Sequence, residues 1–279
     1  MKKIIAAFDG LKFSEATKEY AVYMSKHCNA HLVGVFLDDF THHSYTYADV
    51  AAFGGKWEEK VRALDREDNE KRNLSVQLFE DACKPAGLNY SIHRDKNIAF
   101  QDLLQETIYS DLLIISSSET FTGYEHPAPT RFMKDLLAEA ECPVMVVPYT
   151  YKPIQKLVLL YDGHPSSVHA VKMFSYLFPA LKQLPTEVLT VKEEQESLHL
   201  PDNRLMKEFM KRHYPDAKYT VLKGEAENEI TTYLKLQNAD VLVILGAYER
   251  SMVSRWFKRS MADSLLSEVN IPLFIAHKK

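Results

Sequence analysis

The sequence predicts an α/β protein made of two tandem doubly wound α/β domains, each with a five-stranded parallel sheet of the nucleotide-binding, flavodoxin/Rossmann-like kind. Two observations lead to this prediction. Short apolar runs alternate with amphipathic stretches along the chain, and the first half of this pattern recurs in the second half. The chain has 279 residues, which is enough for two domains of ordinary size.

The internal repeat is clearest where each unit begins. Residues 3–10 read Lys-Ile-Ile-Ala-Ala-Phe-Asp-Gly, and residues 156–163 read Lys-Leu-Val-Leu-Leu-Tyr-Asp-Gly. Later segments also match, at a shorter spacing: 90–92 with 219–221, 111–115 with 240–244, and 141–147 with 269–275. The first unit therefore carries extra residues in its middle, which we place in the polar run 41–71.

Each element of the first unit follows from its local pattern. Apolar runs rich in Ile, Val and Leu predict strands that are buried on both faces of a parallel sheet, at residues 2–8, 31–37, 88–93, 111–116 and 143–147. Apolar stripes at helical spacing fill the intervals. Such stripes are formed by Phe100, Leu103 and Leu104 in the first unit, and by Ala170, Val171, Phe174, Leu177 and Phe178 and then Ile230, Tyr233 and Leu234 in the second.

The predicted boundaries give a first unit at residues 1–148, a linker at 149–154 and a second unit at 155–279. Pro148 and Pro153 bracket the linker, and its short length favours units that pack against each other. We expect residues 143–148 to pair with residues 272–277, since pairing two edge strands removes an aggregation-prone edge. The chain would then be a monomeric pseudo-dimer, with a homodimer of such chains as the alternative.

Composition excludes several classes of function. The net charge of −4 predicts no general attraction to nucleic acid or acidic membranes, and no run reaches the roughly 18 apolar residues of a membrane helix. The start of the chain shows no signal-peptide pattern. The three cysteines, Cys28, Cys83 and Cys142, lack a metal-binding or redox spacing, which indicates free thiols in a cytoplasmic protein. No metal site is predicted.

The ends of the first strands are candidate binding positions. In open α/β sheets, ligands bind beyond the carboxyl ends of the strands, where the strand order reverses. Asp9-Gly10 and Asp162-Gly163 would lie at such edges, with His164 directly after the second pair. A carboxylate there can accept a hydrogen bond from a base amino group or a hydroxyl; alternatively, Asp begins a turn and Gly supplies an unusual φ. The turn interpretation is favoured for Asp9, and both stay open for Asp162.

A loop in the second unit is the other candidate. Gly246 follows a buried strand, which permits close approach of a ligand to the backbone, and Ser260 precedes a helix, where free amides can bind phosphate. Four cations lie in this loop: Arg250, Arg255, Lys258 and Arg259. They predict either a solvated loop face or an altered site for an anion or mononucleotide.

These strands, the Asp after the first of them, and the closing Cys-Pro-Val and Ile-Pro-Leu segments resemble the universal stress protein family in its tandem-domain form, over nearly the whole chain. The resemblance implies a loop motif Gly-x2-Gly-x9-Gly-Ser/Thr that holds the ribose and phosphates of ATP. It also implies that the first-strand Asp and a second-strand residue, here near Val191, flank the adenine.

The motif is only partly present. In the second unit its positions hold Gly246, Glu249, Arg259 and Ser260, so two of four fit, and the carboxylate of Glu249 would repel phosphate. In the first unit they hold Ser117, Thr120, Thr130 and Arg131, and none fits. Pro127 and Pro129 also remove amide donors there, so the motif argues against classical triphosphate binding in the first unit.

The resulting hypothesis is a cytoplasmic stress-response protein that acts by binding rather than turnover. The resemblance implies ATP or AMP as ligand, with Mg if ATP is bound, at Asp162, Gly163, Val191, Gly246, Arg259 and Ser260. Asp9, Gly10, His164 and Glu249 are weaker candidates, and no catalytic residue is assigned. The alternatives are a slow ATP hydrolase, and a module with a closed pocket that binds a protein partner.

Overall fold

The fold is an α/β sandwich around one continuous sheet. The computed structural model describes residues 2–37, 43–45, 57–95, 98–121, 126–237, 240–246 and 261–276. Its ten strands run in the order β3-β2-β1-β4-β5-β10-β9-β6-β7-β8. Strands are parallel within each half, and only the central pair, β5 and β10, is antiparallel. The predicted pair of five-stranded parallel sheets is confirmed.

In the first unit, the observed elements follow the predicted order. They are β1 (Lys3–Phe8), α1 (Glu15–Cys28), β2 (His31–Leu37), α3 (Trp57–Cys83), β3 (Tyr90–Asp95), α4 (Ala99–Ile108), β4 (Leu112–Ser116), α5 (Arg131–Glu139) and β5 (Val144–Val147). Each strand begins and ends within two residues of its predicted bounds. Periodicity located these strands because every one of them except the edge strand β3 is almost wholly buried.

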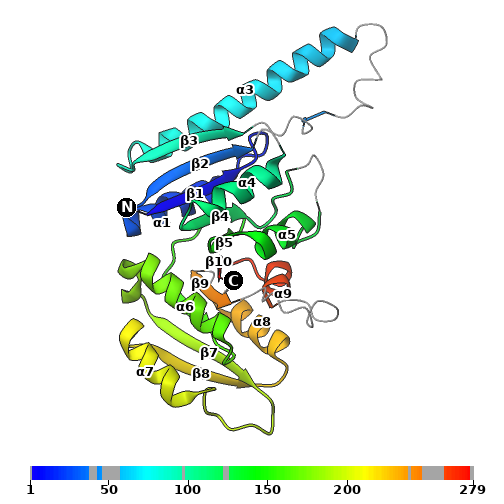
Figure 1. The fold of residues 1–279 in the computed structure, drawn as a ribbon. Helices are drawn as coiled ribbons and strands as arrows, with labels where there is room; N and C mark the ends of the chain where they lie inside the picture. The colour runs from blue at the N-terminus through cyan, green and yellow to red at the C-terminus, as the bar shows by residue number, and fades with distance from the viewer. Residues whose placement is uncertain are drawn as a thin grey trace.

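The second unit repeats this order. Its elements are β6 (Lys156–Leu160), α6 (Pro165–Leu177), the 3-10 helix η2 (Pro179–Gln183), β7 (Thr186–Lys192), α7 (Asn203–His213), β8 (Lys218–Lys223), α8 (Ala226–Leu236), β9 (Val241–Gly246), α9 (Met261–Glu268) and β10 (Leu273–Ala276). The 27 residues of α3 correspond in order to the 11 residues of α7. Part of the extra length of the first unit therefore extends this helix, and α3 projects past the strands in Figure 1.

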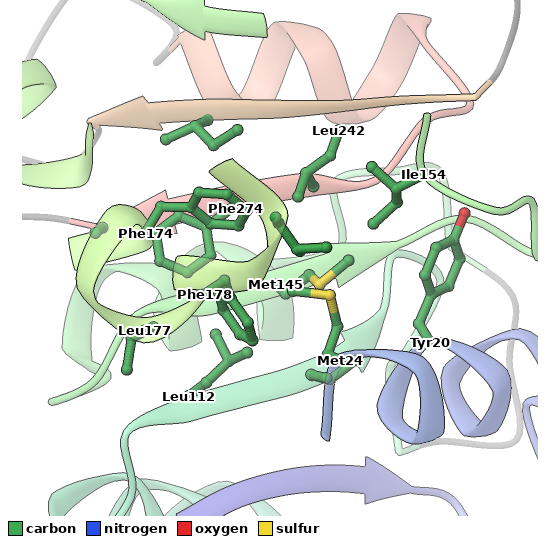
Figure 2. Packing of buried hydrophobic residues seen from close by; sticks show 14 of the residues in the cluster. Tyr20, Met24, Leu112, Met145, Ile154, Phe174, Leu177, Phe178, Leu242 and Phe274 are labelled. Atoms are coloured by element: carbon green, nitrogen blue, oxygen red, sulfur yellow. The ribbon is translucent and has the colours of Figure 1, made fainter. Parts of the chain in front are cut away.

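The two sheets join where the sequence predicts. Met145 lies opposite Phe274 in the antiparallel pair of β5 with β10. The contact continues on one face, where Met24, Leu112 and Met145 of the first unit share a cluster with Phe178 of the second (Figure 2). Because this apolar core crosses the junction, the two halves are packed against each other.

Polar contacts support the same junction. The ammonium of Lys2 donates to the carbonyl oxygens of Tyr176 (3.0 Å) and Leu177 at the end of α6, where the helix dipole favours a cation. In the segment between β5 and β6, the ring of Tyr151 lies 4.8 Å from that of Tyr20, and Ile154 is buried. The short connection is therefore fixed against α1.

A buried carboxylate links neighbouring elements at the start of the second unit's strands. Glu187 on β7 accepts hydrogen bonds from Tyr233 (2.8 Å) and Thr220, and its Oε2 lies 2.6 Å from the ammonium of Lys156. Burial opposes ionisation of Glu187, but these donors outweigh it and lower its pKa. Its negative charge is therefore part of the folded structure at neutral pH.

Replacing Lys156 by methionine should lower the free energy of unfolding by about 2 kcal/mol at pH 7, less than for a fully buried pair because Lys156 is partly exposed. Since the folded pKa of Glu187 is lowered, the loss should shrink as the pH falls through that pKa and Glu187 becomes neutral. Urea denaturation at several values of pH would measure the loss in the free energy of unfolding. The exposed pair of Lys235 with Glu268 provides the control, because Lys235→Met should cost under about 0.5 kcal/mol. A K156M loss no larger than that of K235M would contradict the prediction.

Candidate functional site

The strand order places one switch point in each half of the sheet. In the first half, β1 lies between β2 and β4, so the connections leave β1 in one direction and reach β4 in the other. In the second half, β6 lies between β7 and β9 in the same way. A cleft at the carboxyl ends of β1 and β4, or of β6 and β9, is where this architecture binds ligands.

A cavity of about 470 Å³ occupies the switch point of the first half. This volume lies within the range of roughly 300–1,000 Å³ that small-molecule sites occupy. Its walls come from the β1–α1 connection, the start of α1, the segment after β4, the residue before Pro127 and the residue after Pro148. These residues are Lys12, Phe13, Ser14, Glu15, Ser116, Ser118, Glu119, Thr120, His126 and Tyr149.

Glu119 is the most unusual residue of this cavity. It lines the cavity, yet only 8% of its surface is exposed. Its Oε1 accepts the main-chain N–H groups of Thr120 and Phe121, both at 3.0 Å. Burial and the nearby carboxylate of Asp9 raise the pKa of Glu119 to about 7, against the opposing effect of these N–H donors and of Lys12. A carboxyl group with such a pKa in a cleft indicates a functional site.

Asp9 has a different position from its counterpart in the second unit. It is 1% exposed, and its Oδ1 accepts the N–H of Leu11 at 2.8 Å. Gly10 is also buried, and its carbonyl accepts a hydrogen bond from Ser75 of α3 at 2.8 Å. The predicted turn at Asp9-Gly10 is therefore present, and the same carboxylate also influences Glu119 across the cavity wall.

The remaining groups give the cavity a mixed character. Lys12 and His126 supply basic side chains, and Glu15 and Glu119 supply acidic ones. Ser14 caps α1, since its hydroxyl accepts the N–H of Thr17 at 3.2 Å. The hydroxyl groups of Ser116, Ser118, Thr120 and Tyr149 complete the lining. This arrangement can hold a small polar molecule through hydrogen bonds.

The first-unit motif positions now have defined places. Ser117 follows β4 directly and its N–H donates to Val147 at 2.9 Å, whereas Thr120 lines the cavity. Thr130 caps α5 by accepting the N–H of Met133 at 3.1 Å, and it donates to the carbonyl of Glu119 at 2.9 Å. Arg131 is exposed beside Asp135. Thr130, at a position where the family motif would place a glycine, thus fixes the main chain at Glu119.

In the second unit, the predicted strand-end residues form a surface turn. Asp162 is exposed, and its Oδ1 accepts the N–H of His164 at 2.9 Å. Gly163 has φ +88, and a Cβ there would lie 2.7 Å from Pro201. His164 is exposed and precedes α6, which begins at Pro165. A hydrogen bond within this turn therefore joins Asp162 to His164, and the positive φ of Gly163 lets the chain turn between them.

Gly246 at the end of β9 faces the protein's own backbone. A Cβ at this position would lie 2.3 Å from the carbonyl carbon of Ser166 and 2.6 Å from the nitrogen of Ser167, in the first turn of α6. The close approach that a glycine permits here is thus made by a helix. Val191 is half-buried on β7. Glu249, Arg259, Ser260 and the other loop cations lie outside the described residues.

A second cavity, of about 390 Å³, lies on the α6–α7 side of the second unit. Of the predicted site residues it includes Gly163 alone. Its other walls are Tyr161, Pro165, Val168, His169, Lys172, Asp202, Leu205, Met206 and Phe209, which are mostly apolar. The structure does not bring the predicted second-unit residues together around one cavity within the part of the chain that it describes.

Comparison with solved structures gives full-length matches. A universal stress protein from Archaeoglobus fulgidus is 12% identical, with a TM-score of 0.64 over 99% of this chain and 98% of that chain. A protein of unknown function from Pseudomonas aeruginosa is 12% identical, with a TM-score of 0.63 over 99% and 92%. The chain has the tandem universal stress protein fold. No family model and no curated protein matches the sequence. The structural matches therefore confirm the resemblance at the level of the fold.

None of the helices formed by the described residues is long and apolar enough to cross a membrane. No three His, Cys, Asp or Glu side chains among the described residues come together as a metal site would require.

Sequence reasoning missed the residues that line the first-unit cavity. Glu119 was not singled out because the family motif directs attention to glycines, and the first unit has none at those positions. A usable signal was present, since Ser116-Ser117-Ser118-Glu119 follows a buried strand at the predicted switch point. Applying the strand-end rule to both units, independently of the motif, would have found it.

Proposed function

We propose that this chain is a cytoplasmic universal stress protein that acts by binding a small ligand, and that the cavity of the first unit is its principal site. The observation that carries this proposal is the cavity of about 470 Å³ at the β1–β4 switch point, with the buried carboxyl group of Glu119 in its wall. Adenine nucleosides and nucleotides are the first ligands to test, because the fold is that of the universal stress proteins.

Binding fits the cavity better than turnover. Hydrolysis of a phosphate ester needs a positioned water and groups that neutralise the developing charge. Lys12 is the single lysine or arginine among the described lining residues, and Glu15 and Glu119 oppose it. We therefore propose that the first unit retains its ligand unchanged, and that slow ATP hydrolysis remains the alternative function.

Nucleotide binding by the second unit is a separate proposal. Its phosphate-side candidates, Gly246, Arg259 and Ser260, would act with Asp162, Gly163 and Val191 if this unit binds a nucleotide. The exposed position of Asp162 and the packing of Gly246 against α6 favour the first unit over the second. The boundaries 1–148, 149–154 and 155–279 likewise remain proposed.

Filling the first-unit cavity should weaken ligand binding. Ser118→Trp places a large side chain in the cavity, and we expect the affinity for adenosine, AMP and ATP to fall at least about tenfold, since the ligand would lose its contacts. Isothermal titration calorimetry, with and without magnesium, would measure this. Thr232→Trp, on the exposed side of α8, is the control. Equal binding by wild type and S118W would place the site elsewhere, and phosphate release lost in S118W would favour the hydrolase.

A further inference from the structure

The two carboxyl oxygens of Glu119 have different surroundings. Oε1 accepts two main-chain N–H groups, which use both of its lone pairs. No hydrogen bond joins Oε2 to any of the described residues, although the side chain is buried and lines the cavity. A proton on this carboxyl group must therefore be on Oε2, where it can point to a ligand.

The charged groups around Glu119 favour that proton. Asp9, at the end of β1, is 1% exposed and places a second carboxyl group nearby. Glu15, at the start of α1, is the second acidic side chain that lines the cavity. Lys12 in the β1–α1 connection and His126 before Pro127 are the basic groups among the described lining residues. Two buried carboxyl groups that share a site do not both ionise readily, because like charges repel.

We propose that Glu119 determines the specificity of the first-unit cavity by donating a hydrogen bond from Oε2 to an acceptor atom of an uncharged or singly charged nucleoside ligand. This inference rests on the proposed function of the cavity. The protonated carboxyl group presents a donor and no charge, whereas its ionised form presents only an acceptor. Among the described lining residues, a triphosphate would meet the acidic side chains of Glu15 and Glu119, with the buried Asp9 nearby, and one lysine, so adenosine should bind more tightly than ATP.

The consequence is a binding equilibrium that takes up a proton. With its pKa at about 7, Glu119 keeps its proton in most molecules at pH 6 and in about one in ten at pH 8. If the protonated form binds, the affinity for adenosine should be about tenfold higher at pH 6. At pH 8, each binding event should take up close to one proton.

The substitution Glu119→Gln isolates this effect. A glutamine can keep the oxygen that accepts from Thr120 and Phe121, and it places an N–H donor where Oε2 stands. Calorimetry with adenosine at pH 6 and pH 8, in buffers of different ionisation enthalpy, would measure affinity and proton uptake. We expect E119Q to bind adenosine with the same affinity at pH 6 and pH 8, and without proton uptake. We expect His126→Asn to keep the tenfold dependence, which excludes histidine as its source.

The outcomes separate this inference from the proposed function. Adenosine binding that is independent of pH in the wild type, or ATP that binds more tightly than adenosine, overturns the inference and leaves the proposed function standing. Absence of binding by adenosine, AMP and ATP overturns both. A carbon-13 NMR titration of the free protein tests the proton directly, because a Glu119 midpoint near the ordinary value of about 4.5 would overturn its assignment.

Discussion

Replacing Glu119 by glutamine should raise the free energy of unfolding at pH 8 by about 3 kcal/mol and leave it nearly unchanged at pH 4. The pKa of this group rises from 4.5 to about 7 on folding. Folding therefore favours the protonated form, and the wild type loses stability as the pH rises from about 4.5 to about 7. At about 1.4 kcal/mol for each pKa unit, the loss reaches about 3 kcal/mol above pH 7. Glutamine removes it because it does not ionise.

Chemical denaturation of both proteins at pH 4, 6 and 8 would measure this difference. Ionisable groups distant from Glu119 contribute equally to wild type and variant, so their contributions cancel. Glu15→Gln is a matched control, because Glu15 faces the same cavity from an exposed position. Its effect should stay within about 0.5 kcal/mol at each pH. A stability difference between E119Q and wild type that does not change with pH would show that Glu119 titrates as an ordinary surface glutamate.

Gly246→Ala should lower the free energy of unfolding by about 3 kcal/mol. The added Cβ would lie 2.3 Å from the carbonyl carbon of Ser166 and 2.5 Å from its oxygen. These are main-chain atoms of α6, so no side-chain rotation can relieve the overlap, and the helix has to move away from β9. The effect should therefore be at the upper end of the range for overpacked sites. Thermal unfolding followed by circular dichroism would detect it as a lower Tm.

The same variant distinguishes two roles for this glycine. If Gly246 served only to let a ligand approach the backbone, alanine would weaken ligand binding and leave the free protein as stable as before. Gly87→Ala is the control for the effect of a glycine-to-alanine change without steric overlap, because Gly87 has φ +66 and nothing lies within 4 Å of the new Cβ. It should cost about 1 kcal/mol through backbone strain alone. A G246A loss no larger than that of G87A would argue against the packing role.

Most of the fold could be predicted from the sequence. The strands were found because buried parallel strands are continuous apolar runs, and the repeat placed the same order of elements in both halves. The repeat even marks equivalent contacts, since Asp111 and Asp240 both lie beside the first residues of the opening strands, Lys3 and Lys156. Pairing of β5 with β10 was also predicted and is confirmed, because each unit has one apolar edge strand that the other can cover.

The sequence predicted where in the fold the candidate site lies, but not which residues form it. The strand-end rule placed it at the switch points, and the cavity of the first unit is there. The motif then directed attention to the second unit, whereas the clearest cavity at a switch point among the described residues is in the first. A sequence pattern cannot show that Asp162 is exposed while Asp9 is buried, since both precede glycine at the end of similar strands.

The sequence alone determined the duplicated α/β architecture and the edge of the sheet where a ligand would bind, because those properties follow from periodic burial and strand order along the chain. The tertiary structure decided which residues line the cavity at the first switch point and which carboxyl group has an altered pKa. Those properties depend on segments distant in sequence, such as Asp9 near Glu119 and Ser166 against Gly246. The energy of a buried charge or of an atomic overlap depends on distance in space, which residue spacing does not specify.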